Sequence, residues 1–207
     1  MTTCGFLGRL VVLSVAALAL GAGSSQPARA STGCPDYSLG RYFLPWLDPA
    51  YYTLAPNGGL ENGSKAWSLS GGARVVPGNE SFDVRAAGDK YSLSLPPGST
   101  ATTGTTCVET LDSTMRLFAV NSGSLLSTLK VEVLYEDTFG TPRAQTIALL
   151  AGTARWQPTL PTAFLANLLH PPLLTDGKVE VAFRFTPQGD LSGWRLDDVY
   201  VDPFKGS

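Results

Sequence analysis

Three carboxylates from opposite ends of the chain are the residues whose types and spacing most clearly suggest chemistry. Asp197 and Asp198 stand together within residues 193–201, a run of aromatic and β-branched residues that predicts a closing β-strand. Glu61 lies far upstream, in a glycine-rich stretch before Trp67. If the first and last strands of one domain lie side by side, Glu61 meets both aspartates. Clustered carboxylates either take up protons or hold a cation.

The first 30 residues are typical of a secretory signal peptide. Arg9 precedes an apolar segment from Leu10 to Leu20, and Ala28-Arg29-Ala30 gives the small-x-small pattern found before a cleavage site. The apolar run is shorter than the roughly 18 residues of a transmembrane helix, and no later stretch reaches that length. We therefore expect a secreted, extracellular chain that begins at Ser31 and has no membrane span.

The remaining residues suit one domain with a substantial core. We expect residues 31–55 to form an aromatic and proline-rich N-terminal arm and residues 56–207 to form the folded domain. Loss of the signal peptide removes two arginines and no acid, so the formal charge falls from −2 to −4. A chain without a basic stripe is not expected to bind nucleic acid.

Two cysteines, Cys34 and Cys107, lie outside the signal peptide. An even number in an exported chain favours a disulfide, which would tie the arm to the middle of the domain. Closing so long a loop contributes on the order of 4 kcal/mol where the geometry is unstrained. Two free thiols are the alternative.

The pattern from Asn57 onward predicts an all-β fold of short antiparallel strands. Two segments alternate apolar and polar residues over a long run, Leu129–Glu136 and Lys178–Thr186. The Gly/Ser/Thr-rich residues 98–106 read as a loop, Gly71-Gly72 as a hairpin turn, and residues 161–172 as a helical turn. Further strands are expected at 66–69, 73–76, 81–84, 91–95, 115–120, 146–150 and 155–157. A two-sheet jelly-roll sandwich is the simplest packing for these strands.

The two ends of this domain resemble those of carbohydrate-binding-module-like domains with the galactose-binding-like fold. Asn57-Gly58-Gly59-Leu60-Glu61 with Trp67 is similar to their opening motif, and residues 193–201 are similar to the strand that closes them. The chain also resembles uncharacterised bacterial secreted proteins of this architecture. The resemblance covers residues 57–202 and implies a galactose-binding-like jelly roll.

The resemblance also implies a structural calcium ion. By motif position, its ligands would be Glu61 and either Asp197 or Asp198, with the Gly59 carbonyl as a third. Strand alternation places neighbouring residues on opposite faces, so only one aspartate can point at the ion unless a bulge intervenes. The alternative is that these acids cap strand ends and accept backbone hydrogen bonds.

A glycan ligand, if there is one, needs aromatic rings and polar side chains on one face. The candidate ligand-binding residues are Glu132, Glu180, Arg184, Trp156 and Tyr91. The charged residues of this set share the polar face of the two long strands, where an ordinary solvated face with cross-strand ion pairs is the competing interpretation. Further candidate rings are Trp46, Tyr51 and Tyr52 of the arm, which either form a ligand platform or pack against the sandwich. Trp67 and Trp194 are expected in the core.

An enzyme is the least favoured class. His170 is the single histidine, no Gly-x-Ser-x-Gly elbow is present, and one histidine provides no conventional zinc set. A glycosidase needs only two suitably spaced acids, and spacing in three dimensions is not readable from the sequence. The leading hypothesis is a non-catalytic β-sandwich with a polysaccharide or cell-surface glycan as partner. The alternative is a structural or interaction domain whose arm, at residues 42–52, contacts a protein partner.

Overall fold

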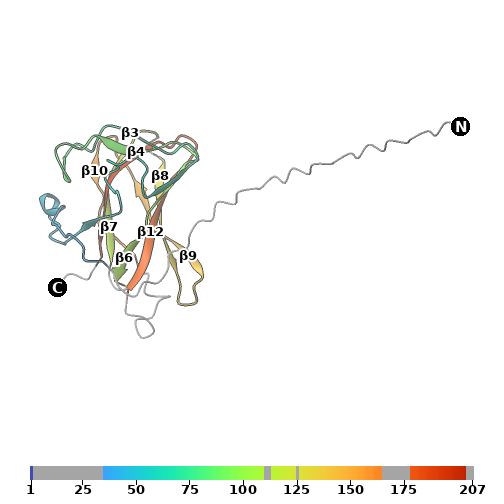
Figure 1. Cartoon of the computed structure of the whole chain (residues 1–207). Helices are drawn as coiled ribbons and strands as arrows, with labels where there is room; N and C mark the ends of the chain where they lie inside the picture. The colour runs from blue at the N-terminus through green and yellow to red at the C-terminus, as the bar shows by residue number, and fades with distance from the viewer. Residues whose placement is uncertain (2–34, 110–112, 125, 165–177, 204–207) are drawn as a thin grey trace.

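The computed structural model describes residues 1, 35–109, 113–124, 126–164 and 178–203. Across these residues the chain forms two antiparallel sheets that face each other (Figure 1). The all-β, two-sheet jelly-roll prediction is confirmed. The His170 segment and the signal peptide lie outside the described residues.

One sheet has seven strands, in the order β10-β7-β13-β4-β3, with β1 also paired to β13 and β11 to β7. Its strands are β1 (Thr53–Leu54), β3 (Arg74–Pro77), β4 (Tyr91–Leu95), β7 (Thr114–Asn121), β10 (Gln157–Pro158), β11 (Thr162–Ala163) and β13 (Trp194–Asp202). The other sheet has six strands, in the order β2-β5-β12-β8-β9, with β6 also paired to β12. Its strands are β2 (Trp67–Ser70), β5 (Thr100–Thr103), β6 (Thr106–Glu109), β8 (Thr128–Glu136), β9 (Pro142–Ala151) and β12 (Lys178–Gln188).

The two long alternating segments are β8 and β12, and they pair directly. Their apolar positions are fully buried between the sheets, while the intervening positions face outward. Trp67 and Trp194 also lie in this core, as predicted.

The first and last strands lie side by side, but not in the predicted pairing. Thr53 and Leu54 of β1 pair with Val201 and Tyr200, and the Gly58 carbonyl accepts a hydrogen bond from the Val199 N–H. Trp67 and the strand that it opens instead pair with β5 in the opposite sheet. The predicted arm therefore contributes a strand, and the opening motif is the corner where the chain crosses from one sheet to the other.

Several local predictions were wrong. Residues 98–106 are not one loop, because Thr100–Thr103 form β5 with Ala101 and Thr103 buried, and β6 begins at Thr106. Gly71-Gly72 turns the chain between sheets rather than within a hairpin; a Cβ on Gly71 would lie 2.3 Å from the Gly98 carbonyl oxygen. Residues 162–163 form β11 instead of a helical turn, and the rest of that turn lies largely outside the described residues.

Residues 81–84 are also not a strand. The Glu80 carboxylate accepts hydrogen bonds from the Phe82 and Val84 N–H groups, and Asp83 has a φ of 52°. These contacts fold residues 80–84 into a tight turn, because they satisfy backbone groups that a strand would pair with a neighbour.

The arm, residues 35–52, covers the outer face of the seven-stranded sheet. Figure 1 shows it (blue) beside β7, on the side away from β9. Phe43 and Tyr52 are fully buried against Phe118 of β7 and Tyr200 of β13. This second apolar cluster sits outside the sandwich core, so the arm is a packed layer of the fold.

Candidate functional site

The two aspartates of the closing strand are both fully buried, at 0% exposure. The register of β13 against β7 shifts between Asp197 and Tyr200, and Asp198 has a φ of 46°. This bulge removes the strict alternation that would have sent one aspartate to each face.

The two carboxylates differ in their partners. Asp197 accepts hydrogen bonds from the N–H groups of Glu80, at 3.0 Å, and Asp198, at 2.8 Å. Neither oxygen of Asp198 has a hydrogen bond of ordinary geometry among the described residues, although the Arg85 backbone N–H lies close enough to lower its pKa, and Arg85 Nε is 4.0 Å from Oδ1. A Cβ on Gly59 would lie 2.8 Å from Asp198 Oδ1, so the carboxylate rests against that glycine.

Glu61 is bound elsewhere. Its Oε1 accepts hydrogen bonds from the N–H groups of Lys90, at 2.8 Å, and Tyr91, at 2.9 Å. No group of three or more acidic, histidine or cysteine side chains within the described ranges is arranged to hold a metal ion. The structure thus brings Gly59 to Asp198 but engages Glu61 with the start of β4. The calcium ligand set remains a prediction.

Burial and neighbouring acids both disfavour the ionised forms of Asp197 and Asp198. Burial raises the pKa of Asp197 to about 9, with repulsion from Asp198 adding to the rise. It also raises the pKa of Asp198 to about 7, with Glu80 and Asp89 adding to the rise and Arg85 opposing it. The cluster therefore holds protons at neutral pH unless a cation replaces them.

Three of the predicted ligand-binding residues lie on the outer face of the six-stranded sheet. Arg184 stands opposite Glu132 in the β12–β8 register and donates from Nε to Glu132 Oε2 at 2.8 Å. Lys130 Nζ lies 3.2 Å from the same oxygen, and these cations hold the pKa of Glu132 below its usual range. Glu180 follows on the same face of β12, opposite Cys107 of β6. Ion pairs occupy the centre of this face.

The other two predicted ligand-binding residues belong to the opposite side of the molecule. Trp156, just before β10, packs on the second apolar cluster, and the Arg195 guanidinium lies 5.7 Å from its ring centroid. Tyr91 is partly exposed at the start of β4, opposite Pro77. The structure therefore splits the predicted set between two sheets.

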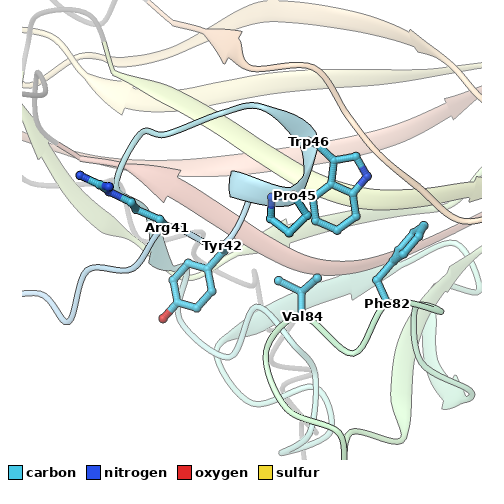
Figure 2. A pocket seen from close by; sticks show the side chains of 6 residues that line it. All are labelled: Arg41, Tyr42, Pro45, Trp46, Phe82 and Val84. Atoms are coloured by element: carbon cyan, nitrogen blue, oxygen red, sulfur yellow. The ribbon is translucent and has the colours of Figure 1, made fainter.

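A pocket of about 490 Å³ opens where the arm meets the 80–84 turn (Figure 2). We call it the arm pocket. In Figure 2, Arg41 and Tyr42 stand at one end, Trp46 and Phe82 stand at the other, and Pro45 and Val84 lie between them. It is lined by Arg41, Tyr42, Pro45, Trp46, Phe82 and Val84.

The arm wall of this pocket is held by an ion pair between the buried Arg116 and the partly buried Asp48. Asp48 accepts from Arg116 Nη1 at 2.5 Å, from the Tyr52 hydroxyl at 2.8 Å and from the Ala50 N–H at 3.1 Å. Burial opposes ionisation, but these hydrogen bonds hold the pKa of Asp48 below its usual range. Arg116 is only 3% exposed, and its guanidinium lies 4.1 Å from the Phe43 ring centroid. The arm is thus pinned by charge as well as by apolar packing.

The other wall is set by the closing strand. Asp197 binds the Glu80 N–H, and the Glu80 carboxylate in turn binds the N–H groups of Phe82 and Val84. Phe82 then meets Trp46 edge to face, with ring centroids 5.1 Å apart, and is 41% exposed. The buried acid Asp197 acts as a positioning residue for the pocket.

The pocket offers aromatic and proline surface beside one guanidinium. Sequence reasoning named Trp46 as a possible ring but missed Phe82, which it placed in a strand. Tyr52, another named ring, is fully buried, while Tyr51 is partly exposed beneath Arg41. The residue types gave no signal for the 80–84 turn, because glutamate is not among the side chains that typically bond to nearby backbone in turns.

One half of the predicted Cys34–Cys107 disulfide, Cys34, lies outside the described residues. Cys107 is buried in β6, and its N–H donates to the Tyr37 hydroxyl at 2.9 Å. The arm thus reaches Cys107 near the expected position, and the disulfide remains a prediction. No helix in the described part of the chain is long and apolar enough to cross a membrane.

No family model and no curated protein sequence matches the chain. Among solved structures it is similar to the CBM22-1–GH10 modules of Clostridium thermocellum xylanase 10B complexed with xylohexaose, with 13% identity and a TM-score of 0.48. That match covers 70% of this chain and 27% of the xylanase chain. It is also similar to the CBM22-1 xylan-binding domain of Paenibacillus barcinonensis Xyn10C, with 16% identity, a TM-score of 0.48, and 72% and 94% of the two chains covered.

A third similar structure is TmCBM61 in complex with β-1,4-galactotriose, with 17% identity, a TM-score of 0.39, and 70% and 94% of the two chains covered. These neighbours are carbohydrate-binding modules of the jelly-roll type, the class that the sequence motifs resemble. At these identities and TM-scores, the likeness carries no argument about what this chain binds.

Proposed function

We propose that this chain is an exported, non-catalytic β-sandwich that binds a carbohydrate in the arm pocket. The observation that carries the proposal is the concave group of Tyr42, Trp46 and Phe82 beside a guanidinium. Small-molecule sites are typically concave and mostly apolar, with a few polar groups that fix orientation. A volume of about 490 Å³ lies within their usual range.

The rings of the pocket are held in place before any ligand arrives. Tyr42 stacks on Tyr200 with ring centroids 4.3 Å apart, and Trp46 packs edge to face on Phe118 at 5.4 Å. A sugar presents an apolar C–H face that can cover an aromatic surface, while its hydroxyls remain available for hydrogen bonds. Prior positioning of the rings lowers the entropic cost of binding.

The test is a glycan array followed by calorimetry on the mature protein. Phe82→Ala removes the exposed ring of the pocket, and we expect it to weaken binding at least tenfold. Phe139→Ala is the matched control, because Phe139 is 90% exposed in the β8–β9 turn and lies outside the pocket. Equal binding by both variants would contradict the pocket as the site. Binding of no glycan by the folded protein would contradict the function itself.

The alternative of a protein partner on the arm would have to use its exposed apolar side chains, Leu44, Leu47 and Tyr51. Phe43 and Tyr52, the central aromatics of residues 42–52, are fully buried against the sheet. We favour the small-ligand site because the pocket is concave, whereas Leu44 and Leu47 stand exposed on the arm outside its lining.

We also propose calcium as a stabilising ion at the acidic cluster. The support is the unpartnered carboxylate of Asp198, which rests against Gly59, together with the unpartnered Oδ2 of nearby Asp89. Calcium prefers oxygen ligands of this kind. The residues fit only in part, because Asp197 is occupied by backbone N–H groups and Glu61 by the start of β4. Arg85, ion-paired with Asp89, would have to move aside.

Thermal unfolding with calcium and with a chelator tests this ion. We expect calcium to raise the melting temperature of the wild type and to leave that of Asp198→Asn unchanged. Glu61→Gln reports whether the opening motif supplies a ligand as the resemblance implies, and Glu136→Gln on β8 is the control acid. A wild-type melting temperature that does not respond to calcium would show that the site is absent.

A further inference from the structure

The cation of the arm pocket differs from the other arginines around it. Arg85 and Arg116 each pair with a carboxylate. The described residues give Arg41 no ion-pair partner, and its guanidinium lies 4.6 Å from the Tyr51 ring centroid. A guanidinium held over a ring face by a cation–π contact still has N–H groups that can donate to a ligand.

The pocket therefore joins two kinds of recognition. Trp46 and Phe82 offer apolar ring surface at one end, and Arg41 lies at the other end with its guanidinium extending outward at the rim (Figure 2). A guanidinium binds a carboxylate with two parallel N–H···O bonds, which neutral hydroxyls match less strongly. A neutral sugar would leave this guanidinium without its best partner.

From this combination we infer that the arm pocket selects an acidic saccharide, a sugar ring that bears a carboxylate. This inference rests on the proposed carbohydrate function and names the class of ligand. The carboxylate of one sugar unit pairs with Arg41 at one end of the pocket, and the C–H face of another unit of the same oligosaccharide packs on Trp46 and Phe82 at the other. Asp83 stands between two lining residues but does not itself line the pocket, so it does not compete for Arg41 there.

The overall charge makes this selectivity measurable. The chain has a formal net charge of −2, and loss of the signal peptide makes it more negative. A protein of that charge does not attract polyanions nonspecifically. Binding of an acidic saccharide must then depend on a local cation, and it weakens as salt screens the partly exposed pair.

The test compares each acidic oligosaccharide with its methyl ester, which keeps the ring and removes the charge. Trimers of galacturonate, glucuronate and mannuronate cover the main ring stereochemistries. We expect at least one free acid to bind at least tenfold more tightly than its ester, and Arg41→Gln to abolish the difference. Arg41→Lys should restore part of it. Arg74→Gln, an equal charge change on edge strand β3, should leave it intact.

The outcomes separate this inference from the function on which it rests. If neutral glycans bind through Phe82 and the free acids bind no better than their esters, the acidic class is wrong and the pocket function stands. The same conclusion follows if Arg41→Gln binds every ligand as the wild type does. If the folded protein binds neither acidic nor neutral saccharides, the proposed function itself fails.

Discussion

On the outer face of the six-stranded sheet, Glu132 is flanked by Arg184 and Lys130, and the strands themselves present the polar residues. On the outer face of the seven-stranded sheet, a separate segment, the arm, covers the strands and forms a pocket with the 80–84 turn. The first face satisfies its charges internally. The second face keeps ring surface and the Arg41 guanidinium available to a ligand. If the arm pocket is the site, the layer added on the sheet and not its polar face carries the function.

Removing an apolar side chain that anchors the arm should have the largest effect on the free energy of unfolding. Phe43→Ala removes a fully buried ring from the second cluster, and we expect a loss of about 3–5 kcal/mol in the free energy of unfolding. Phe139→Ala, at a 90% exposed position, should change it by no more than about 0.5 kcal/mol. Urea titration of both variants checks this comparison. A small loss for Phe43→Ala would show that the arm is not part of the cooperative fold.

Breaking the ion pair under the arm should cost more stability than breaking the ion pair on the six-stranded face. Asp48→Asn leaves Arg116 buried without a counter-charge, and we expect a cost of about 3 kcal/mol. Glu132→Gln leaves Arg184 and Lys130, whose side chains are about one-third exposed and can turn to water, so it should cost about 1 kcal/mol or less. Equal costs in urea titration would remove the distinction between the two faces.

The pH dependence of stability should reflect the acidic cluster behind the pocket. Asp197 and Asp198, with pKa values of about 9 and 7, hold protons in the native state that the unfolded chain releases above about pH 3.9. The native state then binds more protons, so without metal its stability falls as pH rises from 5 to 8. The slope approaches about 1.4 kcal/mol per pH unit for each proton held.

Urea unfolding with a chelator at several pH values measures this slope. Asp198→Asn cannot ionise and should roughly halve the decline between pH 5 and 7, because Asp197 still holds its proton there. Asp190→Asn, at an exposed acid, is the matched control and should retain the decline. Wild-type stability that rises with pH over this interval would contradict the burial of unpaired carboxylates.

The smallest effect expected is on glycan affinity at the six-stranded face. Arg184→Gln and Glu180→Gln should alter binding less than twofold, because those residues lie on the sheet opposite to the one that the arm pocket covers. A tenfold loss in calorimetry would instead support the ligand set predicted from the sequence.

The sequence predicted the parts of the fold that follow from strict alternation. The apolar faces of β8 and β12 are evident from residue types alone, and so is the aromatic and β-branched closing strand. The neighbouring chain ends also followed from the opening and closing motifs, although β1 rather than Trp67 made the contact.

The rest depends on interactions that sequence spacing does not encode. The small residues of β5 do not predict a strand, because a short run of threonine and alanine also occurs in loops. The bulge at Asp198 overrides the alternation that would separate two adjacent acids. The pocket arises from residues 41–46 and 82–84, which are brought together by an ion pair and by a chain of hydrogen bonds from Asp197. Neither arrangement leaves a periodic pattern.

The most direct test of the carbohydrate site is an NMR titration of the mature protein with the tightest saccharide from the glycan array. The account predicts that the largest amide shift changes fall at residues 41–46 and 82–84, with those of residues 130–134 and 180–186 unchanged. Changes concentrated on β8 and β12, with none at the arm, would contradict the arm pocket as the binding site.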